Sequence, residues 1–167
     1  DLTCWATIDP ETLVISTMTG ARVAPDYELW LAESEYSANE PHTFAALALR
    51  KQPMARFTDL PDRDRTRSIR FNEVWRPLGV NQELRVLFLA DGACWGAAGM
   101  VRVGRDFTDR ETDFLTAVAP AIASATRLAV RSETRGTVQR RGVAIVVVGA
   151  HGELRAFRHS DVGRAIL

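Results

Sequence analysis

The sequence is poor in the residues and motifs that mark catalytic, metal-binding or disulfide-bonded proteins. Its 167 residues include only two cysteines and three histidines. Two cysteines are too few for a disulfide framework, and their spacing is not that of a metal site. The chain also has no Gly-x-Ser-x-Gly elbow, no glycine-rich phosphate loop and no paired-carboxylate motif. We therefore expect no enzymatic activity, no catalytic or metal-binding residues, and no cofactor.

The isolated histidines are interpreted as ordinary core or surface residues. His42, His151 and His159 each have a carboxylate two residues away, but none has a second histidine or a cysteine in a ligand motif.

Charge and hydropathy exclude two further classes of protein. Basic and acidic residues balance at 21 each, so there is no excess of positive charge for binding nucleic acid, and Lys51 is the only lysine. No uncharged apolar run approaches the roughly 18 residues of a membrane span, and no signal peptide is visible. We expect a cytoplasmic protein with no membrane association. The chain begins without Met, which suggests a fragment of a longer protein.

The most informative stretch is a pair of apolar runs joined by Asp91-Gly92, a dipeptide that favours a two-residue type I′ turn. That turn predicts that Phe88 pairs with Trp95, Val86 with Ala97 and Leu84 with Gly99. One face would then carry Leu84, Val86, Phe88, Trp95, Ala97, Val101 and Val103, and the other Glu83, Arg85, Leu87, Leu89, Cys94, Gly96, Ala98 and Met100. Because both faces are largely apolar, this hairpin belongs in the middle of a sheet, with other elements covering each side.

The remaining patterns predict an α+β domain around this hairpin. We expect strands at 3–8 and 13–19, helices from 26 and at 42–49, an edge strand at 53–57, a polar mobile loop at 59–66 and a helix at 67–78. A Thr108-x-x-Glu111 capping box predicts the start of a long helix, whose small residues allow another helix to approach closely.

The C-terminal part is predicted to be separate from this domain, which we expect to span residues 1–131. Residues 132–141 lose the apolar periodicity and indicate a linker. Residues 142–148 and 153–157 predict a third hairpin, followed by a short helix at 159–167, a segment too small to form a core of its own.

The order and spacing of several short pieces resemble a GAF domain of the kind found in LuxR-type helix-turn-helix transcription regulators. The pieces are CWATIDP (4–10), Glu35-Tyr36 with Phe44, WRPLG (75–79) with ELR (83–85), CWG (94–96) and DFTxxE (106–111) leading into Leu115 and Ala119-Pro120. Residues 142–157 resemble the opening strands of a PAS-like segment. The resemblance implies an antiparallel sheet with helices on one face and a ligand cavity on the other.

The same resemblance implies a sensory or dimerisation module that binds DNA only through a C-terminal domain outside this chain, and that forms a homodimer. Either a helix packs tightly against Gly96 and Ala98, or a cavity for a small apolar or aromatic ligand opens there. We expect the long helix on the Phe88 face and the ligand on the opposite face. The predicted ligand-binding residues are Trp30, Tyr36, Phe44, Phe71, Trp75, Arg85, Gly96, Ala98 and Met100. The alternatives are a dimerisation domain without a ligand, and a redox sensor using Cys4 and Cys94.

Overall fold

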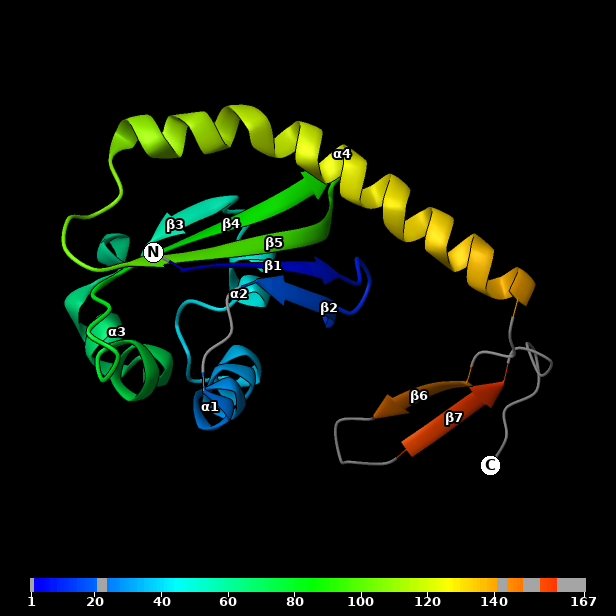
Figure 1. Cartoon of the computed structure of the whole chain (residues 1–167), viewed down its shortest axis with the longest axis horizontal. Helices are drawn as coiled ribbons and strands as arrows, with labels where there is room; N and C mark the ends of the chain where they lie inside the picture. Colours follow the sequence, from blue (N-terminus) through cyan, green and yellow to red (C-terminus); the bar gives the residue numbers. More distant parts are fainter. Residues whose placement is uncertain (1, 21–23, 141–143, 149–153, 159–167) are drawn as a thin grey trace. The chain divides into compact units, whose positions relative to one another are not determined.

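A five-stranded antiparallel sheet forms the centre of the N-terminal part of the chain (Figure 1). The computed structural model describes residues 2–20, 24–140, 144–148 and 154–158, and the chain divides into two compact units, Asp1–Arg127 and Leu128–Leu167. The strands are β1 (Leu2–Ile8), β2 (Ile15–Gly20), β3 (Met54–Arg56), β4 (Gln82–Ala90) and β5 (Ala93–Arg102). Their order across the sheet is β2-β1-β5-β4-β3, which places the predicted hairpin at the centre and the predicted edge strand at one edge.

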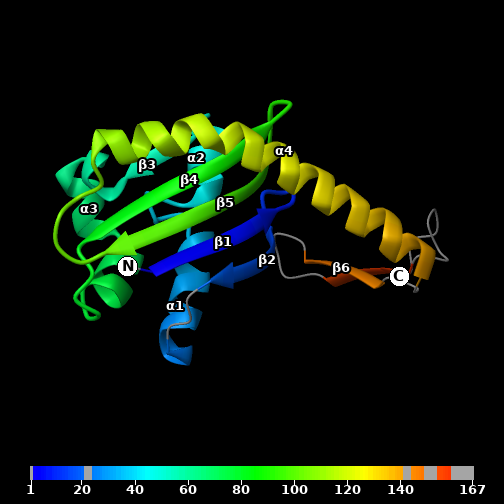
Figure 2. The ribbon, with the colours of Figure 1, turned by 45° about the horizontal axis from the view of Figure 1, so that its top comes forward.

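Helices cover both faces of this sheet, whereas helices were expected on only one face and a ligand cavity on the other. They are α1 (Pro25–Tyr36), α2 (Phe44–Leu49), the 3-10 turn η1 (Phe57–Asp59), α3 (Asp62–Arg67), the π-helical turn η2 (Arg70–Trp75) and α4 (Asp109–Arg140). Helix α4 runs along one face of β4 and β5, and α1 lies on the opposite side of the sheet (Figure 2). The predicted α+β class and antiparallel sheet are confirmed.

The register of the central hairpin differs from the prediction by one residue beyond the turn. Asp91 and Gly92 both have positive φ, 53° and 77°, as a type I′ turn requires. A shift between Phe88 and Leu89 then leaves Trp95 as an extra residue in β5, so that Phe88 pairs with Gly96. The partners of Val86 and Leu84 are Ala98 and Met100, not Ala97 and Gly99.

This shift reverses the predicted faces of β5. Gly96, Ala98 and Met100 now share a face with Leu84, Val86 and Phe88, and that face packs against α4 through Ala119 and Ala123. Val101 lies on the opposite face, in a cluster with Val74, Trp75 and Val80. A β-bulge changes the face of every residue beyond it, and turn chemistry alone did not predict one here.

Gly96 has no room for a side chain, because the backbone of β1 and the side chains of Phe88 and Thr126 lie close to it. A Cβ atom there would lie 2.7 Å from the carbonyl oxygen of Ala6 and 3.3 Å from Cγ2 of Thr126 on α4. Of the two alternatives for this face, tight helix packing is therefore the correct one.

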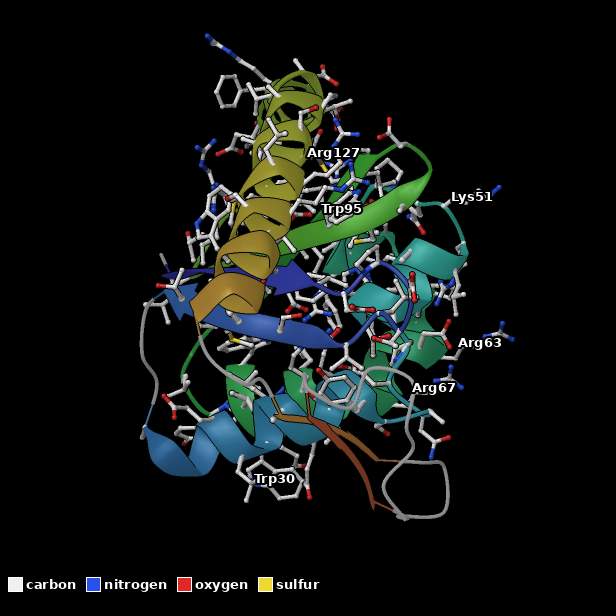
Figure 3. The ribbon with its side chains drawn as sticks, turned by 90° about the vertical axis from the view of Figure 1, so that its right-hand side faces the viewer. Trp30, Lys51, Arg63, Arg67, Trp95 and Arg127 are labelled. Carbon is white, nitrogen blue, oxygen red and sulfur yellow. The ribbon has the colours of Figure 1, made fainter. Side chains whose placement is uncertain are left out.

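Side-chain contacts also hold both ends of the part of α4 that packs on the sheet. Thr108 and Glu111 form the predicted capping box, with the Thr108 amide donating to Glu111 at 2.7 Å and the Glu111 amide to Thr108 at 3.3 Å. Arg127 forms an ion pair with Asp91 in the β4–β5 turn, near the labelled Trp95 (Figure 3).

Turn η2 is wider than an α-helical turn. The amide of Arg76 donates to the carbonyl of Phe71, five residues back, at 2.9 Å, and that of Val80 to Trp75 at 2.9 Å. Within this turn Arg70, Val74 and Trp75 are all buried.

Two segments predicted as loop or linker are helical. Residues 62–66 of the expected loop belong to α3 (Asp62–Arg67), in which acidic residues of the first turn pair with arginines of the last turn three residues further on. Residues 132–140, expected to be a linker, continue α4.

The C-terminal hairpin is present in the second unit. Strands β6 (Ala144–Val148) and β7 (Leu154–Arg158) pair antiparallel in a separate two-stranded sheet. The helix predicted at 159–167 lies outside the described residues.

Candidate functional site

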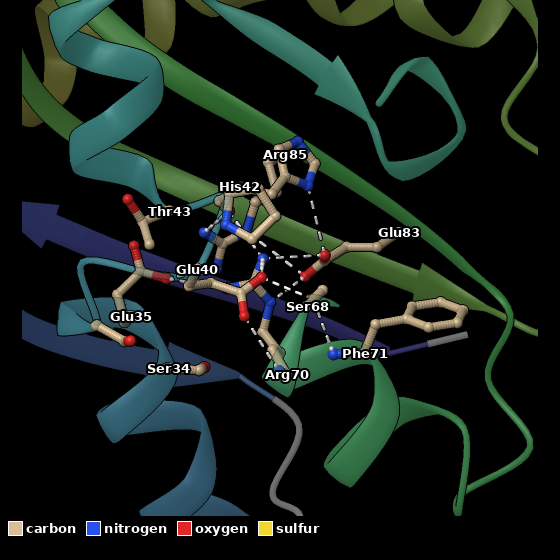
Figure 4. A network of polar contacts seen from close by, with 12 residues as sticks. Ser34, Glu35, Glu40, His42, Thr43, Ser68, Arg70, Phe71, Glu83 and Arg85 are labelled. Atoms are coloured by element: carbon tan, nitrogen blue, oxygen red, sulfur yellow. Dashed lines mark hydrogen bonds and ion pairs between the residues drawn. The ribbon is translucent and has the colours of Figure 1, made fainter. Parts of the chain in front are cut away.

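A network of charged side chains is buried on the sheet face opposite α4 (Figure 4). Its charged members are at most 8% exposed, and they come from α1, the turn before α2, η2 and β4. They are Glu35, Glu40, Arg70, Glu83 and Arg85, together with His42 and the hydroxyl of Ser68. Buried charges are costly unless each is paired and hydrogen-bonded, so the geometry of every member matters.

Glu83 of β4 lies at the centre of the network. One of its oxygens accepts hydrogen bonds from Nε of Arg70 at 3.1 Å and from Nε1 of Trp75 at 3.3 Å. Its other oxygen accepts from Nη2 of Arg70 at 3.3 Å, and Nε of Arg85 lies 3.5 Å from the carboxylate. Burial alone would raise the pKa of Glu83, but Arg70 and Arg85 hold it well below its usual range.

Arg85 ties the sheet to α1 and α2. Its Nη2 donates to Glu35 at 2.7 Å, and its guanidinium carbon lies 3.8 Å from the centroid of the Phe44 ring. Glu35 also accepts from the backbone amide of Phe44 at 2.5 Å. Burial would lower the pKa of Arg85, but the carboxylates of Glu35 and Glu83 raise it, so it stays charged.

Glu40 and the carbonyl of His42 complete the network. Glu40 accepts from the Ser68 hydroxyl at 2.6 Å and from the Arg70 amide at 3.2 Å. The His42 carbonyl accepts from Nη2 of Arg70 at 2.7 Å and from Nη1 of Arg85 at 2.6 Å. The two arginines therefore hold the 40–43 turn, which lies outside any helix or strand, against the sheet.

The carboxylates and guanidinium groups pair with one another away from solvent, so their chemistry is that of a structural clamp. The ring nitrogens of His42 are buried in the same network without a hydrogen-bond partner. No group of three or more His, Cys, Asp or Glu side chains among the described residues is arranged to hold a metal ion.

The nine predicted ligand-binding residues do not surround one pocket. Phe44, Trp75 and Arg85 belong to the network or to the core beside it, and Phe71 stacks on Phe57 with ring centroids 4.0 Å apart. Gly96, Ala98 and Met100 lie on the opposite face, under α4. Trp30 and Tyr36 are 44% and 57% exposed on α1, and Trp30 points away from the sheet (Figure 3).

An open groove lies at the start of α4. It has a volume of about 420 Å³ and is lined by Met100, Arg102, Phe107, Arg110, Glu111, Phe114 and Leu115. Arg102 lines it, with the guanidinium carbon 3.9 Å from the Phe107 ring centroid and Nη1 donating to Glu111 at 2.9 Å. Met100 is the one predicted ligand-binding residue found in this groove.

Among the residues that the structure describes, the outward face of α4 is apolar and mostly exposed, with Val118 half-buried. Its members follow one another at alternating steps of four and three residues: Phe114, Val118, Ala121, Ala125 and Leu128. Phe114 and Leu128 are 64% and 62% exposed, and Ala121 and Ala125 are also exposed. This 3.5-residue repeat is the pattern of a helix that packs along another helix.

The same helix is the candidate membrane span among the described residues. By length and composition alone, Asp109–Ser132 could cross a bilayer. Its longest uncharged stretch is 114–126, about 20 Å at 1.5 Å per residue, which is short of the roughly 30 Å hydrocarbon core. Ala119 and Ala123 also pack on the sheet.

The two cysteines are free and lie far apart along adjacent strands. Cys4 pairs with Gly99 of β5, and Cys94 is five residues from that position, roughly 17 Å along the strand. Burial raises the pKa of Cys94 to about 11. Neither feature suits a regulatory thiol pair.

Sequence reasoning missed most of the network because its members are scattered along the chain. Arg85 was singled out, but Glu35, Glu40, Arg70 and Glu83 were not. The available signal was in β4, where Glu83 and Arg85 alternate with Leu84 and Val86 in a strand predicted to be covered on both faces.

The comparisons with known proteins give no relative. No protein-family model, no curated protein and no solved structure matches this chain.

Proposed function

We propose that this chain is a non-enzymatic regulatory module that self-associates through the outward face of α4. The proposal follows the GAF-like resemblance and takes its dimerisation alternative as the better supported one. The observation that carries it is the exposed heptad-spaced apolar face of α4. In this proposal the module belongs to a transcription regulator, and a domain outside these 167 residues contacts DNA.

The residues on this face suit a second helix. Ala121 and Ala125 at the middle have small side chains, so two helix axes can approach closely. Phe114 and Leu128 lie seven residues on either side of Ala121 and supply larger apolar area. The sheet packs on the opposite side of α4, through Ala119 and Ala123, so this outward face remains accessible to a partner.

A second copy of the chain is the simplest partner for such a face. Arg127 and Arg131 end the uncharged stretch of α4 too early for a bilayer span, and the five seam residues carry no charge that would select a charged partner. A two-fold dimer brings the same face of α4 from each copy together.

Small-molecule binding is a second candidate, and the groove at the start of α4 favours it. Its apolar lining includes Met100 and Phe107, and Phe114 belongs both to the groove and to the proposed dimer seam. A ligand here would therefore act on the seam directly. This candidate differs from the predicted one, which placed the ligand at Gly96 and Ala98.

The test is the mass of the 167-residue chain in solution, measured by light scattering after size exclusion. We expect wild type to behave as a dimer of 18.5 kDa chains. Ala121→Glu and Ala125→Glu should each weaken association about 30-fold or more, the effect of about 2 kcal/mol from placing a charge in an apolar interface.

Thr116→Glu is the matched control. Thr116 is exposed on α4 but lies about 140° around the helix from Ala121, so the same new charge falls outside the seam. A wild-type chain that stays monomeric at roughly 100 μM, about a hundred times a typical 1 μM Kd, contradicts the proposal. So does a Thr116→Glu effect as large as that of Ala121→Glu.

A further inference from the structure

The imidazole of His42 is completely buried and makes no hydrogen bond. The residue is 0% exposed, and both ring nitrogens are buried without a hydrogen-bond partner. Its nearest charged neighbour is Glu83, with Nδ1 3.6 Å from a carboxylate oxygen. Such a group calls for an explanation, because buried polar atoms in folded proteins are nearly always satisfied.

The charges around His42 do not balance. Arg70 from η2 and Arg85 from β4 supply two positive charges. Three carboxylates face them: Glu83 from β4, Glu35 from α1 and Glu40 from the turn that contains His42. Turn η1 contributes only the uncharged ring of Phe57, whose centroid is 6.3 Å from that of His42. With neutral His42 the cluster therefore carries one excess negative charge, and one added proton would cancel it.

The closed geometry nevertheless disfavours protonation of the His42 imidazole. Both arginines donate to the backbone carbonyl of His42, at 2.7 and 2.6 Å. A protonated imidazole would therefore place a third positive charge close to these two guanidinium groups. Glu83 is the carboxylate nearest the imidazole, but Nδ1 of His42 lies 3.6 Å from its oxygen, beyond hydrogen-bond distance, and both Glu83 oxygens already accept from Arg70. A protonated His42 therefore has no hydrogen bond in the closed geometry, and it gains one only by moving, either toward Glu83 or into water.

We propose that His42 is a proton-binding site whose protonation releases the 40–43 turn from the sheet, so that mildly acidic pH opens this side of the domain. The turn has no regular hydrogen-bond ladder and is held by the side chains of the network and by Arg50, whose Nη2 donates to the Pro41 carbonyl at 2.9 Å. It can therefore open without melting the sheet. Opening would free the Phe44 end of α2 and the Glu35 end of α1 together, because Glu35 bonds the Phe44 amide. The inference does not depend on association through α4.

The direction of the pH effect follows from burial. Burial lowers the pKa of His42, and the attraction of Glu83 offsets this only in part. An open or unfolded chain, with a pKa near its ordinary value of about 6.5, therefore takes the proton first as the pH falls. The closed form is fully favoured above about pH 6.5 and loses stability below it. One proton changes the opening equilibrium by up to about tenfold per pH unit.

The test uses the full chain with His151→Gln and His159→Gln, which leaves His42 as the sole imidazole. Amide hydrogen exchange is measured at pH 7.5 and 5.5 and expressed as protection factors. We expect protection at residues 42–47 to fall up to about tenfold at pH 5.5, while β4 and β5 stay protected. His42→Gln, which cannot take the proton, should make the protection of residues 42–47 independent of pH in this range.

An NMR titration of the His42 imidazole gives a second measurement that does not need a folded His42→Gln variant. An apparent pKa below 6.5, together with falling protection of residues 42–47, supports the proposal. An apparent pKa at or above 6.5 overturns it, because the closed form would then hold the proton better than the open one. Unchanged protection at pH 5.5 also overturns it, as does an equal pH dependence in His42→Gln.

Discussion

Arg70 and Glu83 share two hydrogen bonds between side chains that are 1% and 2% exposed. One comes from a π-helical turn and the other from a central strand, so the pair joins two elements that have no backbone ladder between them. A buried pair of this kind contributes specificity more than net stability, but removing one partner leaves a buried charge without compensation.

Replacing Arg70 by Met should therefore destabilise the domain strongly. The new side chain has similar length but leaves Glu83 and Glu40 without their main cation, and we expect a loss of about 3–5 kcal/mol in the free energy of unfolding. Urea denaturation monitored by tryptophan fluorescence measures it. Arg63→Met is the control, because Arg63 is 86% exposed, and its effect should stay within about 0.5 kcal/mol. Equal effects of the two variants would show that the network does not hold the fold.

Adding one methyl group at Gly96 should cost more than adding one at Gly99. A Cβ at Gly96 meets the backbone oxygen of Ala6 at 2.7 Å, and this oxygen belongs to the neighbouring strand β1, so it cannot rotate away as a side chain can. At Gly99 it meets the Cys4 sulfur at 3.1 Å, which can rotate away. We expect Gly96→Ala to lower the free energy of unfolding by about 1–3 kcal/mol, and Gly99→Ala by less. Thermal melts of the two variants measure these losses, and a larger loss for Gly99→Ala would refute the tight fit of the β1 backbone against Gly96.

The thiol of Cys94 should be nearly inert in the folded protein. Burial raises its pKa from the ordinary 9.0 to about 11, which lowers its thiolate fraction at pH 8 by about 100-fold. In a Cys4→Ser background, a disulfide reagent should modify the native chain about 100-fold more slowly than the chain unfolded in urea. Native and unfolded rates that agree within about threefold, far inside that 100-fold expectation, would restore the redox alternative.

Local patterns predicted most elements of the fold, but they missed the helical residues within 59–66 and 132–140 and the one-residue change of register in β5. The Asp91-Gly92 turn and the Thr108–Glu111 capping box depend on neighbouring residues, and both were correct. The bulge at Trp95 depends on how two strands fit the surrounding core, which no short pattern encodes. Through that bulge Gly96 and Ala98 moved from the predicted ligand face to the face under α4.

The buried network was harder to predict than the sheet. Its members, from Glu35 to Arg85, are up to 50 residues apart, and isolated Glu and Arg residues in helices are most often on the surface. The one local sign of the network was the presence of Glu83 and Arg85 in a strand whose two faces are otherwise apolar. Their partners could be identified only once the turn before α2 and η2 were placed over β4.

The wide turn at η2 has a consequence for the length of the chain. Its five-residue hydrogen bonds accommodate one residue more than an α-helical turn of the same span, and this lets Arg70 and Trp75 both reach Glu83. In an ordinary α-helix, residues five positions apart lie about 140° apart around the axis, so Arg70 and Trp75 would not both face one carboxylate. Deleting one residue between them would bring the two donors to a four-residue spacing, about 40° apart in an α-helix, and both would still face Glu83. The wide turn therefore accommodates one extra residue, and a chain shorter by one residue here can keep both donors on Glu83.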